Sequence, residues 1–334
     1  MSFRSAVTAA TPAKARNVAV HRHLYTPPLL RNSTRPIALV YGNCQAEALR
    51  RVLAAHAGFS AEYSMLRVPA VHEITSRQAR LVRSRMSEVE VFITQDIRDG
   101  YRDLAIGSQE LAAGLTAGAR VVRYPVAFYR GLHPFLVYVY DGGPLAVSAP
   151  IIDYHDVRIL YAAGRGWSTD DTLGWLASLH IDADWVRETA RRSLVELRRR
   201  EAGMPVQLAD VIADHAHQGR SFWTINHPTN NLVREMARQV LMHLDYDEHD
   251  AVLCAQQTYL DHLAAPREAE VLRALGVATA GQDGEDWVVR GRRVPRREIV
   301  EAHLNFYTRQ PSLLENGLAR HARLFSQLGL PALA

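Results

Sequence analysis

Three short apolar runs, separated by stretches of helical periodicity, are the feature that most constrains the fold of this chain. They are Ile37–Tyr41, Val89–Thr94 and residues 120–124, each with the length of a buried strand. Helices are predicted at 46–55, at about 73–87 and at about 108–117. Strands that alternate with helices favour a parallel sheet with helices on its faces. We therefore expect an α/β fold, with a parallel sheet flanked by helices in a flavodoxin-like arrangement.

The rest of the chain is predicted to be largely helical. Helices are expected at 170–179, Ala183–Glu201, 208–217 and 232–244, with a short strand-like run at 221–225 and a hairpin at 287–294. The clearest punctuation in the later part is Pro266. We divide the chain into a flexible basic arm at 1–35, a catalytic domain at 36–262 and a helical C-terminal extension at 263–334.

Composition limits the class of protein. The 334 residues are 48% hydrophobic, which is enough for a sizeable core, and the formal charge is +4. All basic residues except Lys14 are arginine or histidine. Arginine richness fits either a coding bias or a surface that attracts anions such as phosphates. No compact run of basic residues interleaved with aromatics is present, which argues against nucleic acid as a partner.

Cellular location is inferred from cysteine usage and apolar runs. The chain has two cysteines, Cys44 and Cys254, too few for the disulfide framework of a secreted protein. No stretch reaches 18 consecutive apolar residues, and the N-terminus has no secretory apolar block. We expect a cytoplasmic protein with free thiols and no membrane span. The histidines form no metal-ligand pattern with cysteines or carboxylates, so we expect no metal.

The first predicted strand runs directly into the motif Gly42-Asn43-Cys44-Gln45. Open α/β sheets bind ligands at the carboxyl ends of their strands, and a helix N-terminus favours an anion. Such a position lowers the pKa of a cysteine thiol, while Gly42 permits the sharp turn. Cys44 is therefore a candidate nucleophile, and nearby backbone N–H groups are candidate oxyanion donors. The alternative is a buried structural cysteine.

A thiol nucleophile needs a base, and His227 is the histidine whose setting fits. It follows the strand-like run 221–225 and precedes a helix, and Pro228 favours an extended His227. Asn226 is a candidate to orient the imidazole ring, although an ordinary Asn-His-Pro turn is the alternative. Gln95 and Asp96 follow Val89–Thr94 at the same sheet edge. Gln95 is a candidate oxyanion donor, and Asp96 either orients His227 or caps a helix.

A glycine-flanked arginine provides a possible phosphate site. Arg165 lies between Gly164 and Gly166, before a predicted helix. Backbone N–H groups in such a loop, together with the guanidinium, suit a phosphate. A single Gly-x-Gly is otherwise an ordinary turn.

Two motifs together resemble the WcbI-type polysaccharide biosynthesis family. These are residues 42–46 (Gly-Asn-Cys-Gln-Ala) and residues 224–230 (Thr-Ile-Asn-His-Pro-Thr-Asn), within a resemblance that covers about 36–262. Proteins of this family are assigned as acetyltransferases of bacterial capsule assembly and bind coenzyme A. The resemblance implies that Cys44 and His227 form the catalytic pair and that CoA or an acyl-CoA binds near them. We expect the coenzyme to be bound by Gly42, Asn43, Gln45 and Arg165.

The order of parts also resembles that of the Gly-Asp-Ser-Asn-His esterases. Cys44, Gln95 and His227 would fill the positions of nucleophile, oxyanion donor and histidine. Those esterases carry an aspartate three residues before the histidine, where this chain has Thr224. Two residues, Asn226 and Asp96, therefore remain candidates for the group that orients the His227 ring.

The expected function is acyl transfer from acetyl-CoA or another thioester to a hydroxyl, on a sugar or a small molecule, through a Cys-His pair. A cysteine-dependent ester or thioester hydrolase and a non-catalytic CoA- or glycan-binding subunit remain alternatives. A catalytic Cys44 is expected to react with iodoacetamide well below pH 8. The sequence does not specify the acceptor, the acyl chain or the oligomeric state, and a homo-oligomer is left open.

Overall fold

The computed structural model describes residues 35–143, 145–215, 221–247, 258–277 and 284–333. The predicted arm, apart from Arg35, and Cys254 lie outside these residues. Among the described residues, no helix is both long and apolar enough to cross a membrane.

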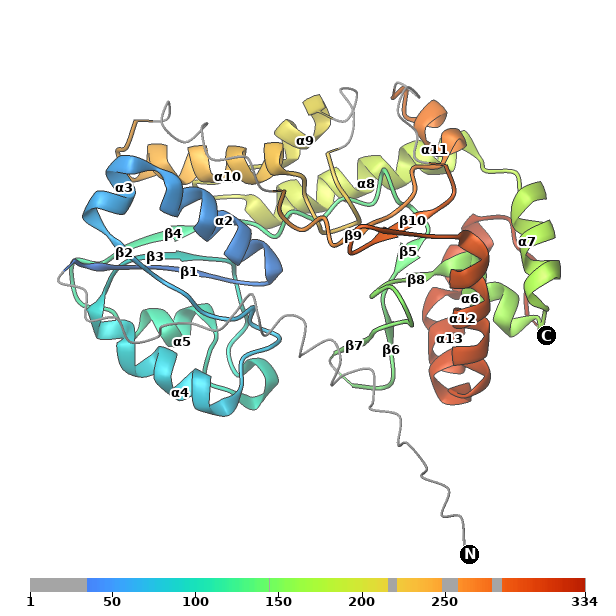
Figure 1. The fold of residues 1–334 in the computed structure, drawn as a ribbon, viewed down its shortest axis with the longest axis horizontal. Helices are drawn as coiled ribbons and strands as arrows, with labels where there is room; N and C mark the ends of the chain where they lie inside the picture. Colours follow the sequence, from blue (N-terminus) through green and yellow to red (C-terminus); the bar gives the residue numbers. More distant parts are fainter. Residues whose placement is uncertain (1–34, 144, 216–220, 248–257, 278–283, 334) are drawn as a thin grey trace, which may run out of the picture.

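A four-stranded parallel sheet forms the N-terminal half of the molecule (Figure 1). The strand order is β2 (Ser64–Leu66), β1 (Ile37–Tyr41), β3 (Val89–Thr94) and β4 (Arg120–Arg123). The expected α/β architecture is confirmed, with β1 and β3 at the predicted bounds. The sequence patterns missed β2, which has only three residues. The chain places β2 on one side of β1 and β3 on the other, so a topological switch point lies between β1 and β3, where sheets of this order bind ligands.

Helices cover both faces of this sheet. Above it in Figure 1 lie α2 (Cys44–Ala55), α3 (Ala57–Glu62) and α10 (Asn230–His243), and below it lie α4 (Ser76–Arg85) and α5 (Ser108–Ala112). Side chains of β1 alternate between two cores, as the period of two in a strand requires. Ala38 and Val40 enter the core that includes α2 and α10, while Leu39 and Tyr41 enter the core that includes α4.

The second half is largely helical, as predicted. Its helices are α6 (Val157–Gly164), α7 (Thr169–Ser178), α8 (Ala183–Glu201), α9 (Ala209–His215), α11 (Ala269–Ala274), α12 (Arg296–Thr308) and α13 (Pro311–Gln327). Its short strands are β5 (Leu136–Val137), β6 (Val139–Tyr140), β7 (Ala146–Val147), β8 (His155–Asp156), β9 (Leu263–Ala264), β10 (Trp287–Val289) and β11 (Arg292–Val294). Two single turns of 3₁₀ helix lie at Met86–Glu88 and Tyr101–Asp103. The predicted hairpin is confirmed by the antiparallel pair β10 and β11.

The prediction of a strand at 221–225 was wrong. Only an isolated bridge between Phe222 and Pro228 forms there, and the intervening residues bend. Pro228 has no N–H with which to extend the pairing, and the chain reverses between these two residues. The result is a tight loop that carries Asn226 and His227.

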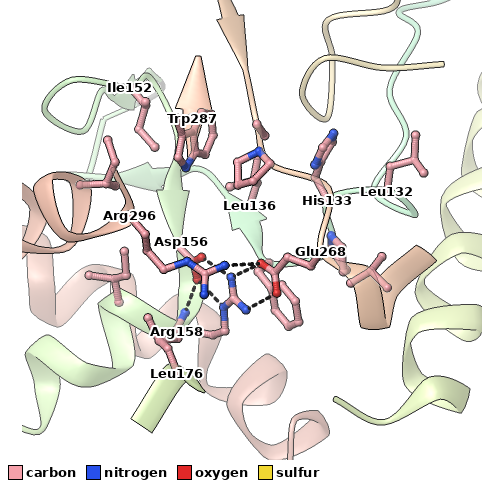
Figure 2. A pocket seen from close by; sticks show the side chains of 17 residues that line it. Leu132, His133, Leu136, Ile152, Asp156, Arg158, Leu176, Glu268, Trp287 and Arg296 are labelled. Carbon is pink, nitrogen blue, oxygen red and sulfur yellow. Dashed lines mark hydrogen bonds and ion pairs between the residues drawn. The ribbon is translucent and has the colours of Figure 1, made fainter. Parts of the chain in front are cut away.

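A buried ion cluster ties the C-terminal segment to α6. The Arg158 guanidinium, 5% exposed, lies 2.6 Å from carboxylate oxygens of Asp156 and Glu268, and 3.7 Å from the centre of the Phe135 ring. Figure 2 shows these groups in the wall of a pocket that Trp287 also lines. Glu268 belongs to the segment 263–334, which we predicted to be a separate extension. Its ion pair with Arg158 joins this segment to α6. Its treatment as a separate unit stays a prediction.

Candidate functional site

Cys44 is the first residue of α2, and two residues, Gly42 and Asn43, separate it from β1. Asn43 caps the helix, because its side-chain oxygen accepts a 2.9 Å hydrogen bond from the Gln45 N–H. Since this cap satisfies an N–H of the first turn, the helix begins two residues earlier than predicted. Cys44 thus stands at the carboxyl end of β1, beside the switch point, and its side chain is half-buried.

Gly42 is required by the close packing around this turn. A Cβ atom there would lie 2.5 Å from the Gln95 side-chain oxygen and 2.8 Å from the Tyr124 hydroxyl, and the φ angle is +157°. The same Gln95 oxygen accepts a 2.8 Å hydrogen bond from the Asn43 N–H. Gln95 follows β3, so this bond joins the ends of the two strands that flank the switch point.

Gln45 connects three separate segments of the chain. Its amide nitrogen donates 2.8 Å bonds to the backbone carbonyls of Ala127 and Asn226, and its amide oxygen accepts from the Ala127 N–H at 3.0 Å. The amide of Gln95 also donates to that oxygen, at 3.4 Å. Gln45 is fully buried. Its polar atoms are therefore engaged by the protein, which fits a positioning residue better than the coenzyme contact we expected.

A hydroxyl network surrounds Asn226. The Tyr154 hydroxyl donates to the Asn226 side-chain oxygen at 2.5 Å and accepts from the Thr224 hydroxyl at 2.8 Å. The side chain of Asn226 also lies near the Tyr138 hydroxyl and acts to lower its pKa. Thr224, which stands where the esterases have aspartate, thus supports Tyr154. Sequence reasoning missed Tyr138 and Tyr154, because they belong to no motif and reach the site only through the folding of residues 135–156.

His227 is buried against this network. Its ring meets that of Tyr154 edge to face, with centroids 6.1 Å apart, and lies 5.0 Å from the ring centroid of His262. The loop is held by a 2.8 Å hydrogen bond from the Trp223 N–H to the His227 carbonyl. The structure therefore gathers the two predicted motifs: Gln45 links the Cys44 turn to the loop of His227, and Tyr154 contacts both Asn226 and the histidine ring.

The electrostatics of Cys44 differ from the prediction. Although Cys44 keeps some exposed surface, loss of solvent around the thiol is the largest cause of a pKa raised to about 12, and the carboxylates of Glu73 and Asp153 raise this pKa further. The N–H groups of Cys44 and Gln45 act in the opposite direction, but more weakly. The expected lowering of this pKa at the helix N-terminus was therefore wrong, because desolvation outweighs the helix terminus. At neutral pH the resting thiol is protonated.

Gln95 and Asp96 follow β3 at the carboxyl edge of the sheet, as predicted, and their contacts differ from the expected ones. Gln95 is fully buried, with its oxygen bonded to Asn43 and its amide facing Gln45, so it braces the turn. Asp96 is exposed and pairs with Arg123 at 3.5 Å. These contacts favour a structural role for Gln95 and a surface role for Asp96.

Arg165 is separated from Cys44. Figure 1 shows α6 among the helices of the opposite half, and Arg165 is exposed at its end. The Gly166 N–H donates to Ala163 and the Trp167 N–H to Ala162, with Gly166 at φ +67°, which is a Schellman cap. Because these N–H groups close the helix, they are not available to cradle a phosphate.

Within the described residues, no three histidine, cysteine or acidic side chains come together as a metal site. The pocket of Figure 2 is lined by His133, Leu136, Arg158, Trp287 and others, and does not include Cys44 or His227.

Comparison with known proteins agrees with this architecture. A family model described as polysaccharide biosynthesis enzyme WcbI matches residues 37–249. A solved structure of WcbI, described as a novel polysaccharide biosynthesis enzyme in its native form without a disulfide bond between CoA and a cysteine, superposes with a TM-score of 0.75. It is 20% identical, and the alignment covers 89% of this chain and 99% of that one. No curated protein matches the chain. This chain belongs to the WcbI family of polysaccharide biosynthesis enzymes.

Proposed function

We propose that this protein transfers an acyl group, most simply acetyl, from a coenzyme A thioester to a hydroxyl of a carbohydrate. The observation that carries the proposal is the connection of the Cys44 turn to the His227 loop through the buried side chain of Gln45. This link supports the proposal, because it ties the turn that carries the thiol to the loop that carries the imidazole. Coenzyme A is assigned as donor because the description of the similar structure names CoA together with a cysteine.

Deprotonation of Cys44 has to accompany its attack, because the thiol is protonated at rest. His227 takes the proton as the Cys44 sulfur bonds to the acyl carbon. The carbon–sulfur bond to CoA breaks, and the departing thiolate takes the proton from His227. The acceptor hydroxyl then attacks the Cys44 thioester, its proton passes to His227, and Cys44 leaves as a thiolate that recovers that proton. The first half-reaction therefore replaces the CoA thioester with a Cys44 thioester, and the second replaces the Cys44 thioester with an ester of the acceptor.

Tyr138 is the group we assign to the oxyanion. The Tyr138 hydroxyl lies beside both Asn226 and Cys44. Burial raises the pKa of Tyr138, and the nearby Cys44 adds to that rise, so the hydroxyl keeps its proton at neutral pH. A neutral donor beside the thiol suits a developing negative charge on the acyl oxygen.

The raised thiol pKa favours a second route to the same transfer. In this route, the acceptor hydroxyl attacks acyl-CoA directly, with His227 as the base, and Cys44 forms no covalent intermediate. The two routes share donor, acceptor and base, and differ only in whether the acyl group rests on Cys44.

Intact-protein mass spectrometry after mixing with acetyl-CoA tests the proposal. The covalent route predicts a gain of one acetyl group in the wild type and none in Cys44→Ala. Acetylation of a sugar acceptor by Cys44→Ala at the wild-type rate would exclude that route and leave direct attack. Absence of both protein acetylation and acceptor acetylation, with folded protein confirmed by circular dichroism, would overturn the acyltransferase assignment.

A further inference from the structure

A second imidazole lies against the proposed base. The ring centroids of His227 and His262 are 5.0 Å apart, and the two ring planes are tilted by 49°. His227 is 5% exposed, whereas His262 is half-buried. At this separation a small rotation of either ring brings a nitrogen of each within hydrogen-bond reach, and such bonds often tighten only when substrate is bound. The sequence patterns did not single out His262.

Main-chain hydrogen bonds fix the segment that carries His262. The Ala265 N–H donates at 2.8 Å to the carbonyl of Trp223, which belongs to the loop of the proposed base. The His262 carbonyl accepts at 2.7 Å from the N–H of Arg290, in the turn between β10 and β11. Leu260 has a φ of +59°, a conformation that a leucine keeps only where its surroundings impose it. Because these contacts involve the backbone, a change of the His262 side chain should leave the segment in place.

The residues that we expected to orient His227 are engaged by other groups. The side-chain oxygen of Asn226 accepts from the Tyr154 hydroxyl at 2.5 Å. Asp96 is exposed and lies in an ion pair at the surface. Thr224, at the position of the esterase aspartate, donates its hydroxyl hydrogen to Tyr154. The group that orients the base therefore has to come from another part of the chain.

Proton transfer creates the need for such a group. When His227 takes a proton its ring becomes a cation, and loss of solvent destabilises a buried cation unless a hydrogen-bond acceptor compensates it. A neutral imidazole has one nitrogen that donates and one that accepts. The accepting nitrogen of His262 can supply this compensation.

We propose that His262 is a positioning residue of the acyl-transfer site and accepts a hydrogen bond from His227 when His227 is protonated. This inference rests on the proposed function. The proton taken from Cys44 stays on one ring nitrogen of His227, and the hydrogen on the other ring nitrogen is shared with His262. No substrate bond forms or breaks at His262, so the proton balance of the two half-reactions is unchanged.

NMR titration of the full chain tests the hydrogen bond directly. The ring signals of His227 are identified by their absence in His227→Gln. His262→Leu removes the acceptor, so the titration midpoint of His227 should move to lower pH by about one unit, a tenfold loss of proton affinity. His262→Gln keeps an acceptor oxygen and should restore part of this shift. His180→Leu, at an exposed position after α7, is the matched control and should leave the midpoint unchanged.

The neighbouring titratable groups do not produce this shift. The Tyr154 hydroxyl, on the other ring that meets His227, stays neutral over the range because burial raises its pKa. The carboxylate of Asp153, near Tyr154, is the same in every variant. A change of midpoint in His262→Leu therefore reports on the imidazole that was removed.

Acetyl transfer gives the second readout, measured as acetylation of Cys44 or as CoA release from acetyl-CoA in the presence of methyl glycosides. His262→Leu should lower kcat about 10- to 100-fold, because a hydrogen bond to a charged group contributes on that scale. The KM for acetyl-CoA should stay unchanged, since His262 acts through the base. Circular dichroism checks the fold of each variant. His262→Phe, which keeps a flat ring without an acceptor, repeats the test if His262→Leu does not fold.

Two results would overturn the inference. One is an unchanged His227 midpoint in His262→Leu, or equal effects in His262→Leu and His180→Leu. The other is a lower midpoint with acetyl transfer at the wild-type rate, which would leave the hydrogen bond without a role in the reaction. Failure of the proposed function looks different, since the midpoint would still move in His262→Leu while the wild type itself transferred no acetyl group.

Discussion

The side-chain amide of Gln45 donates a 2.8 Å hydrogen bond to the backbone carbonyl of Asn226, 181 residues further along the chain. This bond joins the residue after Cys44 to the residue before His227. Neither motif makes a site by itself, because Cys44 follows β1 of the sheet whereas His227 lies in a loop outside that sheet. The relative positions of the thiol and the imidazole therefore depend on a buried amide that touches neither reacting group in the proposed chemistry.

Replacing Gln45 should destabilise the fold and the site together. Gln45→Ala leaves two buried carbonyls and one N–H without their partner, and each such group costs about 1–3 kcal/mol. We expect the free energy of unfolding to fall by about 3 kcal/mol, measured by urea denaturation followed through tryptophan fluorescence. Gln109→Ala, at an exposed position of α5, is the control and should change stability by less than about 0.5 kcal/mol. Similar unfolding midpoints for the two variants would contradict a bridging role for Gln45.

The Cys44 thiol should be slow to alkylate in the folded protein. Its pKa of about 12 lies well above the ordinary value of about 8.5, so the thiolate fraction at pH 8 is far smaller in the native state than in the unfolded state. Iodoacetamide should therefore label Cys44 at least about 100-fold more slowly in buffer than in urea, with a rate that climbs as the pH rises towards 12. Peptide mass spectrometry in a Cys254→Ser background measures this rate. Fast native labelling below pH 8 would show an activated thiolate instead.

Gly42 should not tolerate a methyl group. In Gly42→Ala the new Cβ meets the Gln95 side-chain oxygen, which must then move away from the Asn43 N–H. We expect a loss of stability of about 1–3 kcal/mol, the usual range for overpacking, together with loss of acyl transfer. Gly118→Ala is the matched control, because a Cβ there meets nothing within 4 Å. Thermal unfolding measures the stability of both variants, and the acetylation assay measures their activity. Normal activity in Gly42→Ala would show that the hydrogen bond from Asn43 to Gln95 is dispensable.

Two buried histidines should make the fold sensitive to acid. Burial lowers the pKa of His155 to about 4 and that of His303 to about 3, whereas the unfolded chain titrates near 6.5. Below pH 6.5 the unfolded state binds more protons, so stability falls as the pH drops through 6.5 towards 4. The slope should approach about 1.4 kcal/mol per pH unit for each histidine. Urea unfolding between pH 7 and pH 5 measures it.

The variant His303→Gln separates the two contributions. It should remove roughly half of this pH dependence, because His155 remains neutral between Tyr307 and the Val147 carbonyl. An unchanged slope in His303→Gln would mean that other groups cause the acid sensitivity.

Local sequence determined the elements that bear the chemistry. The apolar run Ile37–Tyr41 has the length of a buried strand and Gly42 permits a sharp turn after it, so the sequence placed Cys44 at a strand-to-helix turn. The pairing of residues 42–46 with residues 224–230 also identified the family. These inferences succeed because strands, turns and motifs depend on neighbours in the chain.

Only the tertiary structure decided what surrounds those residues. Glu73, Asp153 and burial reverse the pKa shift that a helix N-terminus predicts for Cys44, and no local pattern shows how deep a side chain will lie. Tyr138 and Tyr154 reach Asn226 from a segment without a motif, and Arg165 closes its own helix far from the thiol. The physical reason is the same in each case: desolvation and long-range hydrogen bonds depend on packing between distant segments, which the order of residues alone does not reveal.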